Sequence, residues 1–360
     1  MDKELFLEML DIDSTSGREA GFADFLSERL LTSECRVEKF DVGDGTKNLL
    51  FSWGDPQVVF CSHLDTVPPY IPPTCDGTAV HGRGSCDAKG QIFSMYEACR
   101  VLESEGYDGF GLLLLAGEET GSFGAKAFRE QHPGAEWVIV GEPTDNCMAS
   151  ASKGTKAFEV TFEGKAFHSG YPQYGLSAVE MFNDFMNALR SIVFPKDDIL
   201  GDTTWNIGKL VSDNPQNILS DRLTCRVYFR TTFESDVMVS NVMKNIAGPD
   251  AKLRFGRRTV QDGSDIVGKD VAQWQKSMKV NALGGDTPTR YETLDGFPTK
   301  PVAFGSDAPQ LTNFDKKILC GPGSILVAHR PEEHILVSDL EKATENYVHI
   351  YRTLMNKENI

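Results

Sequence analysis

Histidine and acidic side chains follow apolar runs at four places in this chain. His63 ends the run VVFCS, Glu118 and Glu119 follow LLLLAG, Glu142 follows WVIVG, and His329 comes after a glycine-rich turn and the run ILVA. Apolar runs of this length are typical of strands buried on both faces of a parallel sheet. Because chemistry in open α/β sheets gathers at the carboxyl ends of the strands, we expect these polar side chains to lie close together.

Two further acids lie next to this set. Asp65 is two residues beyond His63, on the same face of an extended chain, so its carboxylate could orient the imidazole of a metal ligand. Asp87 precedes a predicted helix, and the default role of an acid in such a place is N-cap. Each position alone has an ordinary structural explanation. Together they supply two histidines and three or four carboxylates, the ligands that a pair of borderline-soft divalent ions requires.

The segment HRPEEH, residues 329–334, superficially resembles a helical zinc motif. It lacks the H-E-x-x-H pattern, and its two histidines are five residues apart, so they would not share a helical face. Pro331 also disfavours a helix interior. We therefore do not expect His334 to bind metal.

Composition narrows the class of protein. The chain has 360 residues, enough for two domains, and a net charge of −16 that makes nucleic acid and anionic membrane surfaces poor partners. The first residues lack the pattern of a secretory signal, and no apolar stretch reaches the roughly 18 residues of a transmembrane span. Eight scattered cysteines without a C-x-x-C pair favour reduced thiols. These features predict a cytoplasmic protein.

The order of segments predicts an α/β fold. Helix-like and strand-like segments alternate up to residue 152, which favours a mixed, mostly parallel sheet flanked by helices. The expected helices and strands of this part are 1–33, 47–53, 57–63, 91–105, 112–115, a short helix near 125, and 136–140. A buried strand at 317–320 and a closing helix at 336–355 resume the pattern near the end of the chain.

A different pattern occupies the middle of the chain. Two segments alternate apolar and polar residues, as antiparallel strands with one exposed face do, and two segments are amphipathic helices. These segments are 158–162 and 224–229, and 178–192 and 235–246. They predict a smaller β-α-β-β-α-β-like domain at 154–262, inserted into a larger domain made of 1–153 and 263–360.

Five motifs carry a resemblance to a known family. They are SHLDTVP, GRGSCDAKG, LLLAGEETGSFGA, VGEPT and GPGSILVAH. In this order they resemble the di-zinc amidohydrolases and peptidases that include acetylornithine deacetylase, succinyl-diaminopimelate desuccinylase and aminoacylase. The resemblance covers essentially the whole chain and is closest to acetylornithine deacetylase-like members. The predicted inserted domain lies where that family carries a lid and dimerisation domain.

The resemblance implies two Zn²⁺ ions per chain, with Co²⁺ or Mn²⁺ as alternatives. The implied ligands are His63, Asp87 and Glu142 for one ion, and Asp87, Glu119 and His329 for the other, with Asp87 as the bridge. Asp65 would steady His63, and Glu118 would be the general base.

The resemblance also implies roles for four residues outside the metal set. His168 would reach the active site of the neighbouring subunit in a homodimer and polarise the scissile carbonyl. Asn217 and Arg230 would bind the carboxylate of the substrate, and Ser306 would belong to a further substrate-binding loop. The ordinary alternatives are a lid-surface histidine for His168 and a strand-edge arginine for Arg230.

The leading functional expectation is removal of an N-acetyl or N-succinyl group from a small amino acid such as ornithine or citrulline, in arginine or lysine biosynthesis. Glu142-Pro143-Thr144 favours a deacylase, because peptidases of the family often have aspartate in place of this glutamate. The alternatives are a dipeptidase or aminopeptidase that uses the same metals, and a catalytically silent zinc-binding protein. Glu118 beside a complete ligand set argues against the silent protein, which needs no base.

Overall fold

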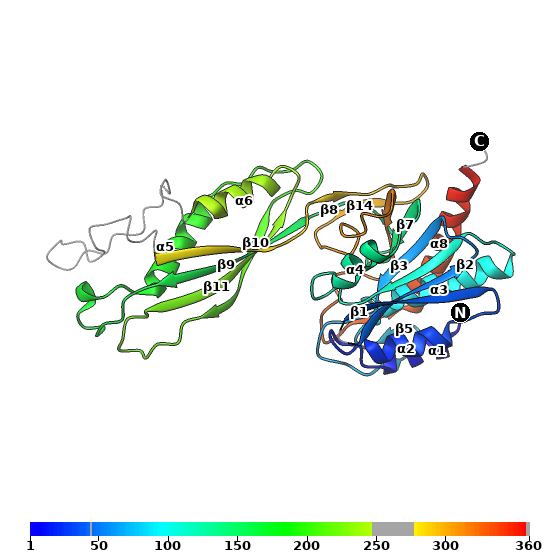
Figure 1. Ribbon diagram of the computed structural model, residues 1–360, viewed down its shortest axis with the longest axis horizontal. Coiled ribbons are helices and arrows are strands. Elements are labelled where there is room, and N and C mark those ends of the chain that lie inside the picture. The colour runs from blue at the N-terminus through cyan, green and yellow to red at the C-terminus, as the bar shows by residue number, and fades with distance from the viewer. Residues whose placement is uncertain (44, 247–276, 358–360) are drawn as a thin grey trace. The chain divides into compact units, whose positions relative to one another are not determined.

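In the computed structural model, residues 1–43, 45–246 and 277–357 are described, and the chain divides into two compact units (Figure 1). The larger unit comprises Met1–Ala151, Arg290–Val302 and Ser306–Ile360. The smaller unit comprises Ser152–Thr289 and Ala303–Gly305. The predicted fold class, a mixed α/β domain with a smaller inserted α+β domain, is confirmed.

The larger unit is built on a six-stranded sheet in the order β1-β2-β6-β3-β7-β15. Its strands are β1 (Cys35–Gly43), β2 (Thr46–Trp53), β6 (Phe110–Leu115), β3 (Val58–His63), β7 (Trp137–Val140) and β15 (Lys316–Leu319). β6, β3, β7 and β15 run parallel to one another, while β2 and β1 extend the sheet in antiparallel pairs. The four parallel strands therefore end at one edge.

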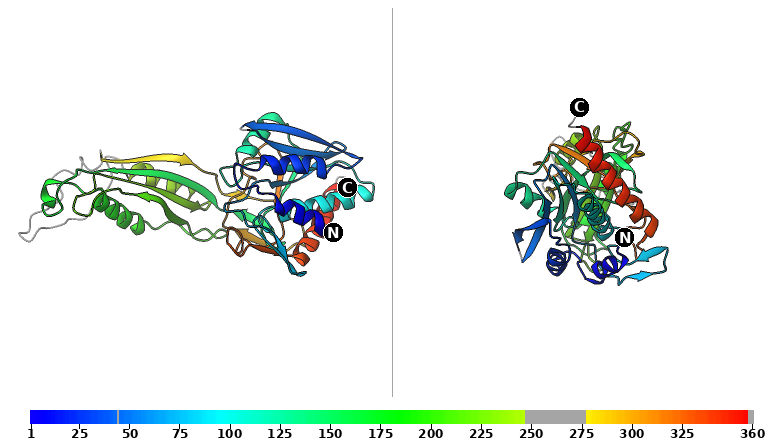
Figure 2. Two further views of the ribbon diagram at one scale, coloured as in Figure 1. Left: turned by 90° about the horizontal axis from the view of Figure 1, so that it is seen from below. Right: turned by 90° about the vertical axis from the view of Figure 1, so that its right-hand side faces the viewer.

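Helices cover both faces of this sheet, which explains the uninterrupted apolar runs in its strands. The helices are α1 (Lys3–Asp11), α2 (Ala20–Arg29), α3 (Lys89–Ser104), α4 (Phe123–Gln131) and α8 (Val337–Lys357), the last being the red helix in Figure 2. Phe51, Phe60 and Leu112 share one core with residues of α1, α2, α3 and α8. On the opposite face, Leu50 lies near Phe128 of α4.

Two three-stranded sheets contribute to the larger unit. Their strands are β4 (Thr74–Cys75), β5 (Ala79–His81) and β16 (His334–Leu336) in one, and β8 (Met148–Ser152), β13 (Thr289–Arg290) and β14 (Thr299–Val302) in the other. The antiparallel pairing of β16 with β5 places His334 opposite His81. This pairing brings the segment that follows His329 beside the segment that precedes Asp87.

The smaller unit is a four-stranded antiparallel sheet with helices packed on one face. The sheet has the order β10-β11-β9-β12. Its elements are β9 (Gly154–Glu163), η1 (Pro172–Tyr174), α5 (Ala178–Ser191), β10 (Thr204–Val211), β11 (Arg222–Thr231), α6 (Asp236–Asn245) and β12 (Met278–Gly284). Alternate residues of β9 and β11, among them Val160 and Val227, form a separate core with Phe185 of α5 and Val239 of α6.

The end of the smaller unit differs from the expectation. Residues 263–360 were expected in the larger domain, yet β12 pairs with β9 and is the closing strand of the predicted β-α-β-β-α-β order. The expected boundary at 262/263 itself lies outside the described residues. β12 is an edge strand in which only Met278 is buried, so its sequence lacks the alternation that marks a half-buried strand.

Three other features bear on the sequence analysis. The expected helix at 1–33 is two helices separated by residues 12–19, and β1 and β10 were not expected. The eight cysteines all lie in the described part of the chain, and their thiols are free. Among the described helices, none is both long and apolar enough to cross a membrane.

Candidate metal centre

The polar residues at the ends of the parallel strands lie at one edge of the large sheet. His63 is the last residue of β3, the Glu118-Glu119 pair follows β6, and Glu142 follows β7. β6, β3 and β7 are parallel neighbours, so these side chains start from adjacent positions. His329 lies in a longer loop that follows β15.

Four of the predicted ligands form a continuous chain of contacts. His63 Nε2 lies 3.0 Å from Asp87 Oδ1, and His329 Nε2 lies 3.2 Å from Asp87 Oδ2. His329 Nε2 is also 2.7 Å from Glu119 Oε1. Possible ligand atoms of His63, Asp87 and Glu119 all lie within 4.8 Å of one another. Asp87 thus turns its two oxygens toward different histidines, as a carboxylate that bridges two ions must.

Asp87 does not cap the helix that follows it. α3 begins at Lys89, its N-cap residue is Ala88, and no side chain caps that end of the helix. The main-chain N–H of Asp87 is bound instead by Glu333, at 3.0 Å from Oε1. The Asp87 carboxylate is therefore available to the two histidines.

The imidazole of His63 is oriented by Asp65, though mainly through the backbone. His63 Nδ1 is 2.8 Å from the main-chain carbonyl oxygen of Asp65 and 3.5 Å from its carboxylate. A proton on Nδ1 is donated to that carbonyl, so Nε2, which faces Asp87, is the nitrogen that can bind a metal once its own proton is displaced. The tautomer that binds a metal through Nε2 is thus the one that the fold favours.

The carboxylate of Asp65 organises the turn that carries Glu118 and Glu119. Its Oδ1 accepts a hydrogen bond from the N–H of Glu118 at 3.0 Å, and its Oδ2 accepts one from the N–H of Glu119 at 3.3 Å. Ser16 Oγ donates to the same Oδ2 at 2.9 Å. Asp65 therefore contacts one predicted ligand, His63, and fixes the backbone of another, Glu119, and of the predicted base.

Glycines make the turn after β6 possible. Gly117 has a φ of +68°, a left-handed conformation that other residues adopt at a cost. The N–H of Gly124 donates to the carbonyl of Ala116 at 3.0 Å, and a Cβ on Gly124 would lie 2.3 Å from that oxygen. Asn48 accepts from the N–H of Ala116 and donates to the carbonyl of Gly124. These contacts close the turn just before and after the two glutamates.

Buried negative charge is concentrated in this cluster. Glu142 is 4% exposed and Asp87 is 6% exposed. Burial raises the pKa of Glu142 well above its usual value, and the nearby charges of Asp87, Glu118 and Asp307 add to this shift. Burial likewise raises the pKa of Glu118. Within the described residues, no lysine or arginine forms an ion pair with Asp87, Glu118, Glu119 or Glu142, so the cluster lacks a permanent cation of its own.

The two histidines respond to that negative charge. Hydrogen bonds to Asp87 and Glu119 raise the pKa of His329 to about 10. Burial lowers the pKa of His63, but its contacts with Asp65 and Asp87 outweigh burial and hold the pKa well above its usual value. Protonated imidazoles thus supply the positive charge that divalent ions would supply when they displace those protons. The donor set, two imidazoles and buried carboxylates with an oriented tautomer, fits such ions.

His329 has an unusual backbone conformation. Its φ is +63°, in the left-handed region that a residue with a Cβ rarely occupies. Residues held there cost energy and concentrate at functional sites. The loop holds His329 in this conformation with its Nε2 near both Asp87 and Glu119, which supports a role for this histidine beyond packing.

The predicted residues of the smaller unit form two separate groups. His168 is exposed, and its Nδ1 accepts a hydrogen bond from the N–H of Gly170 at 3.0 Å. It forms an isolated bridge with Ile218, and the N–H of Ser169 donates to the carbonyl of Asn217 at 2.9 Å. His168 and Asn217 therefore lie on paired segments at one end of the sheet.

Arg230 lies at the other end of the same sheet. The β9–β11 register pairs Arg222 with Glu163, close in sequence to the His168 segment, and pairs Arg230 with Thr155. Residues 155 and 163 are eight apart on β9, which corresponds to about 27 Å of strand. The Arg230 guanidinium lies 5.0 Å from the ring centre of Tyr228. One smaller unit thus does not bring Arg230 together with His168 and Asn217.

Ser306 and its neighbour belong to the larger unit. Ser306 is 3% exposed, and its Oγ accepts a hydrogen bond from the N–H of Ala308 at 3.3 Å. The following Asp307 is also buried and contributes to the raised pKa values of Glu118 and Glu142. Sequence analysis singled out Ser306 and missed Asp307, although an acid directly after a Gly-Ser pair was visible.

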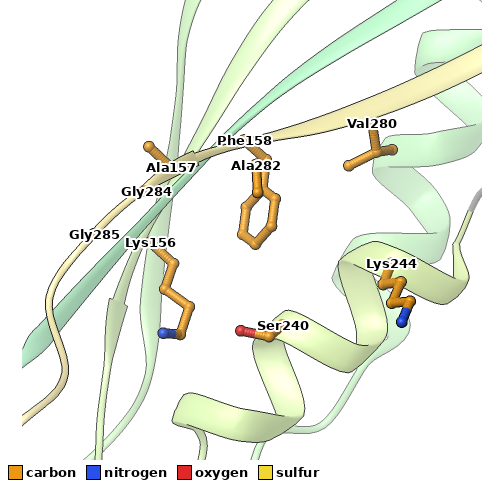
Figure 3. A pocket seen from close by; sticks show the side chains of 9 residues that line it. All are labelled: Lys156, Ala157, Phe158, Ser240, Lys244, Val280, Ala282, Gly284 and Gly285. Carbon is orange, nitrogen blue, oxygen red and sulfur yellow. The ribbon is translucent and has the colours of Figure 1, made fainter.

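A cavity of about 460 Å³ lies within the smaller unit (Figure 3). Phe158, Ala282 and Val280 line it from the sheet, and Ser240 and Lys244 line it from α6. Lys156 also faces it but forms an ion pair with Asp236 at 3.0 Å. None of the predicted site residues lines this cavity.

Comparisons with known proteins identify a family. The sequence profile of Peptidase family M20/M25/M40 matches residues 59–353. A Peptidase M20 domain-containing protein of Schizosaccharomyces pombe is 32% identical over 95% of this chain and 82% of its own length. A probable carboxypeptidase of Aspergillus oryzae is 31% identical over 94% of this chain and 84% of its own length.

A solved structure shares the fold. It is that of a tripeptidase from Staphylococcus aureus, with a TM-score of 0.77, 19% sequence identity, and coverage of 97% of this chain and 96% of that chain. At 19% sequence identity, this similarity shows a shared fold alone.

Proposed function

Because this chain belongs to Peptidase family M20/M25/M40, we propose that it is a metal-dependent hydrolase of the amide bond next to a C-terminal amino acid. The observation that carries the proposal is the contact chain from His63 through Asp87 and His329 to Glu119. Glu118 lies directly beside this chain, in the turn that Asp65 fixes.

The residues that would hold two divalent ions, zinc in the first instance, form two overlapping sets. One set is His63, Asp87 and Glu142, and the other is Asp87, Glu119 and His329. When bound, such ions supply a hydroxide at neutral pH and polarise an amide carbonyl. Asp87 suits the shared position because its two oxygens already face different histidines.

Glu118 is the residue that moves the proton in this proposal. It lies beside the ligand Glu119, and its backbone N–H is held by Asp65 Oδ1. Its carboxylate would take a proton from the attacking water and then deliver it to the leaving nitrogen. Burial raises the pKa of Glu118 well above its usual value, and the positive charge of bound divalent ions would favour the ionised form that the first transfer needs.

The relatives favour a peptide substrate. One curated relative is named a probable carboxypeptidase, and the solved structure with the same fold is a tripeptidase. An N-acyl amino acid such as N-acetylornithine or N-acetylcitrulline has the same reacting group, R–CO–NH–CHR′–COO⁻. Deacylation in amino-acid biosynthesis in the cytoplasm is therefore the second form of the proposal, favoured by Glu142-Pro143-Thr144 alone.

The proposed substrate-binding residues point to a site shared between two chains. Arg230 and the His168–Asn217 pair lie toward opposite ends of one sheet, because Arg230 pairs with Thr155 whereas His168 follows Glu163, and these two β9 residues are about 27 Å apart. A small substrate spans much less than this distance. If these residues contact one substrate, they come from two copies of the chain, which supports a homodimer formed through the smaller unit.

A turnover panel on purified, zinc-loaded protein tests the proposal. The panel contains dipeptides, tripeptides, N-acetylornithine, N-acetylcitrulline and N-succinyl-diaminopimelate, each assayed for released amine. We expect release of the C-terminal residue from short peptides, and faster turnover of one acyl amino acid would select the deacylase form. Stoichiometric zinc without turnover of any compound would contradict both forms and favour a silent zinc-binding protein.

A further inference from the structure

The side chain of Glu333 is enclosed beneath the predicted metal centre. Its Oε1 accepts hydrogen bonds from three backbone donors of one loop, the N–H groups of Gly84 at 3.0 Å, Cys86 at 3.1 Å and Asp87 at 3.0 Å. Its Oε2 accepts a hydrogen bond from the guanidinium of Arg83. Glu333 and Arg83 are 1% and 2% exposed.

Arg83 extends this contact to two further segments. Its Nε donates to the carbonyl of Pro69 at 3.2 Å, and its Nη1 donates to the carbonyl of Arg330 at 3.3 Å. The N–H of Gly82 donates to the main-chain carbonyl of Glu333 at 3.1 Å. The Glu333–Arg83 pair therefore joins the loop that ends at Asp87 to the loop that begins at His329.

Glu333 is unsuited to bind metal itself. A carboxylate offers about four lone-pair positions, and three backbone donors and a guanidinium already occupy those of Glu333. Its effect on the metal centre must pass through the residues that it holds. One of these is Asp87, whose backbone N–H it binds, and another is Arg330, which directly follows His329 and contacts Arg83.

The contacts of the Glu333–Arg83 pair affect the distance between two predicted ligands from distant parts of the sequence. Asp87 Oδ2 and His329 Nε2 are 3.2 Å apart, and both belong to loops outside the large sheet. Loops are free to separate unless tertiary contacts hold them. Buried, charge-assisted hydrogen bonds on one carboxylate are strong and directional, so they can fix both loops at once.

We propose that Glu333, paired with Arg83, is a positioning residue that clamps the Asp87 and His329 loops together and thereby sets the affinity of the metal centre. This inference rests on the proposed function, since it assumes that Asp87 and His329 bind metal. Loss of a residue that orients metal ligands typically weakens metal affinity about 10–100-fold.

The test compares metal affinity in Glu333→Gln with that of the wild type. The glutamine has the same shape but cannot both accept from the three N–H groups and accept from Arg83, since one of its two terminal atoms is a donor. Zn²⁺ affinity is measured by competition with a chromophoric chelator, and the absorption spectrum of the Co²⁺-loaded protein reports ligand geometry. We expect roughly 10–100-fold weaker Zn²⁺ binding and a changed Co²⁺ spectrum.

Asp197→Asn is the matched control. Asp197 is 4% exposed, and its Oδ1 accepts hydrogen bonds from the N–H groups of Ile199 and Leu200 at 2.9 Å each, but it lies in the smaller unit. This variant should lose stability without losing metal affinity. If Glu333→Gln does not fold, Arg83→Lys replaces it, because lysine keeps the charge but cannot make all of the arginine contacts.

The outcomes separate this inference from the proposed function. A wild-type protein that binds no Zn²⁺ would overturn both. Wild-type binding together with unchanged affinity and an unchanged Co²⁺ spectrum in a folded Glu333→Gln or Arg83→Lys variant would overturn the clamp alone. An equal loss of affinity in Asp197→Asn would also overturn it, because the loss would then follow stability in general.

Discussion

The larger and smaller units hold their predicted functional residues in different ways. In the larger unit, His63, Asp87 and Glu119 are fixed through side chain and backbone by Asp65, Glu333 and neighbouring ligands. In the smaller unit, His168 is exposed and its imidazole is held by the N–H of Gly170 from its own turn. The predicted metal ligands are therefore held by contacts within the larger unit, whereas His168 lies on an exposed surface of the smaller unit.

This difference follows from what each group must contact. Metal ligands need fixed geometry, which a buried sheet edge and hydrogen-bonded neighbours provide. A residue that closes over a substrate must first let it enter, so it lies on a surface with few contacts. We therefore expect substitutions in the larger unit to act through metal content and chemistry, and substitutions in the smaller unit to act through assembly and substrate binding.

Removal of a metal ligand should give the largest effect. In His63→Ala or Glu119→Ala we expect the amount of bound metal to fall and turnover to drop to background. Each of these side chains is one of few predicted ligands, and no other predicted ligand can replace it. Elemental analysis of the purified variants measures the metal. His334→Ala is the control, since this histidine lies on β16 and is not a predicted ligand. Full metal content in His63→Ala would remove His63 from the ligand set.

Substitution of the base should lower the rate and leave the metal in place. Glu118→Ala removes the carboxylate that moves the proton, and the expected loss is on the order of 10²–10⁴ in kcat. Its backbone N–H can still donate to Asp65, so the turn that carries Glu119 keeps its anchor. Near-normal turnover would contradict the assignment of Glu118 as the base. A loss of bound metal would indicate that Glu118 is a metal ligand instead.

The same contrast explains what the sequence could predict. The parallel strands are buried on both faces, so their apolar runs are easy to recognise and the polar residues behind them mark the sheet edge. His63, Glu119 and Glu142 were predicted as ligands in this way. The edge strands β1, β10 and β12 have mixed exposure, and their sequences gave no comparable pattern. The end of the smaller unit was misplaced for this reason.

Contacts between distant segments could not be read from the sequence. Glu333 is 246 residues from Asp87 in the sequence. Its segment, HRPEEH, was considered only as a possible helical zinc motif. The main-chain carbonyl of Asp65 orients His63 more closely than its carboxylate does, because the chain bends after β3. Such contacts depend on how loops fold back, which strand and helix patterns do not determine.

The smallest expected effect is a partial recovery of activity, and it tests the smaller unit most directly. His168→Ala and Glu118→Ala should each be nearly inactive alone. If His168 serves the site of a partner chain, a heterodimer of the two variants contains one site with both residues intact. The other site of the heterodimer lacks both.

Random pairing of the two variants makes half of all dimers mixed, so about a quarter of wild-type activity should return. Co-expression of the variants with two different affinity tags isolates the mixed dimer, whose activity should then approach half of the wild type.

The Arg230→Ala variant extends the test, because Arg230 lies at the opposite end of the sheet from His168. If Arg230 serves the site of its own chain, Arg230→Ala should complement His168→Ala well, because the mixed dimer then has one site with both residues intact. A wild-type chain paired with a chain that carries both changes should be nearly inactive, because each site then lacks one of the two residues. No recovery with Glu118→Ala would mean that each site is complete within one chain, and that the distance between Arg230 and His168 excludes one of them from the substrate.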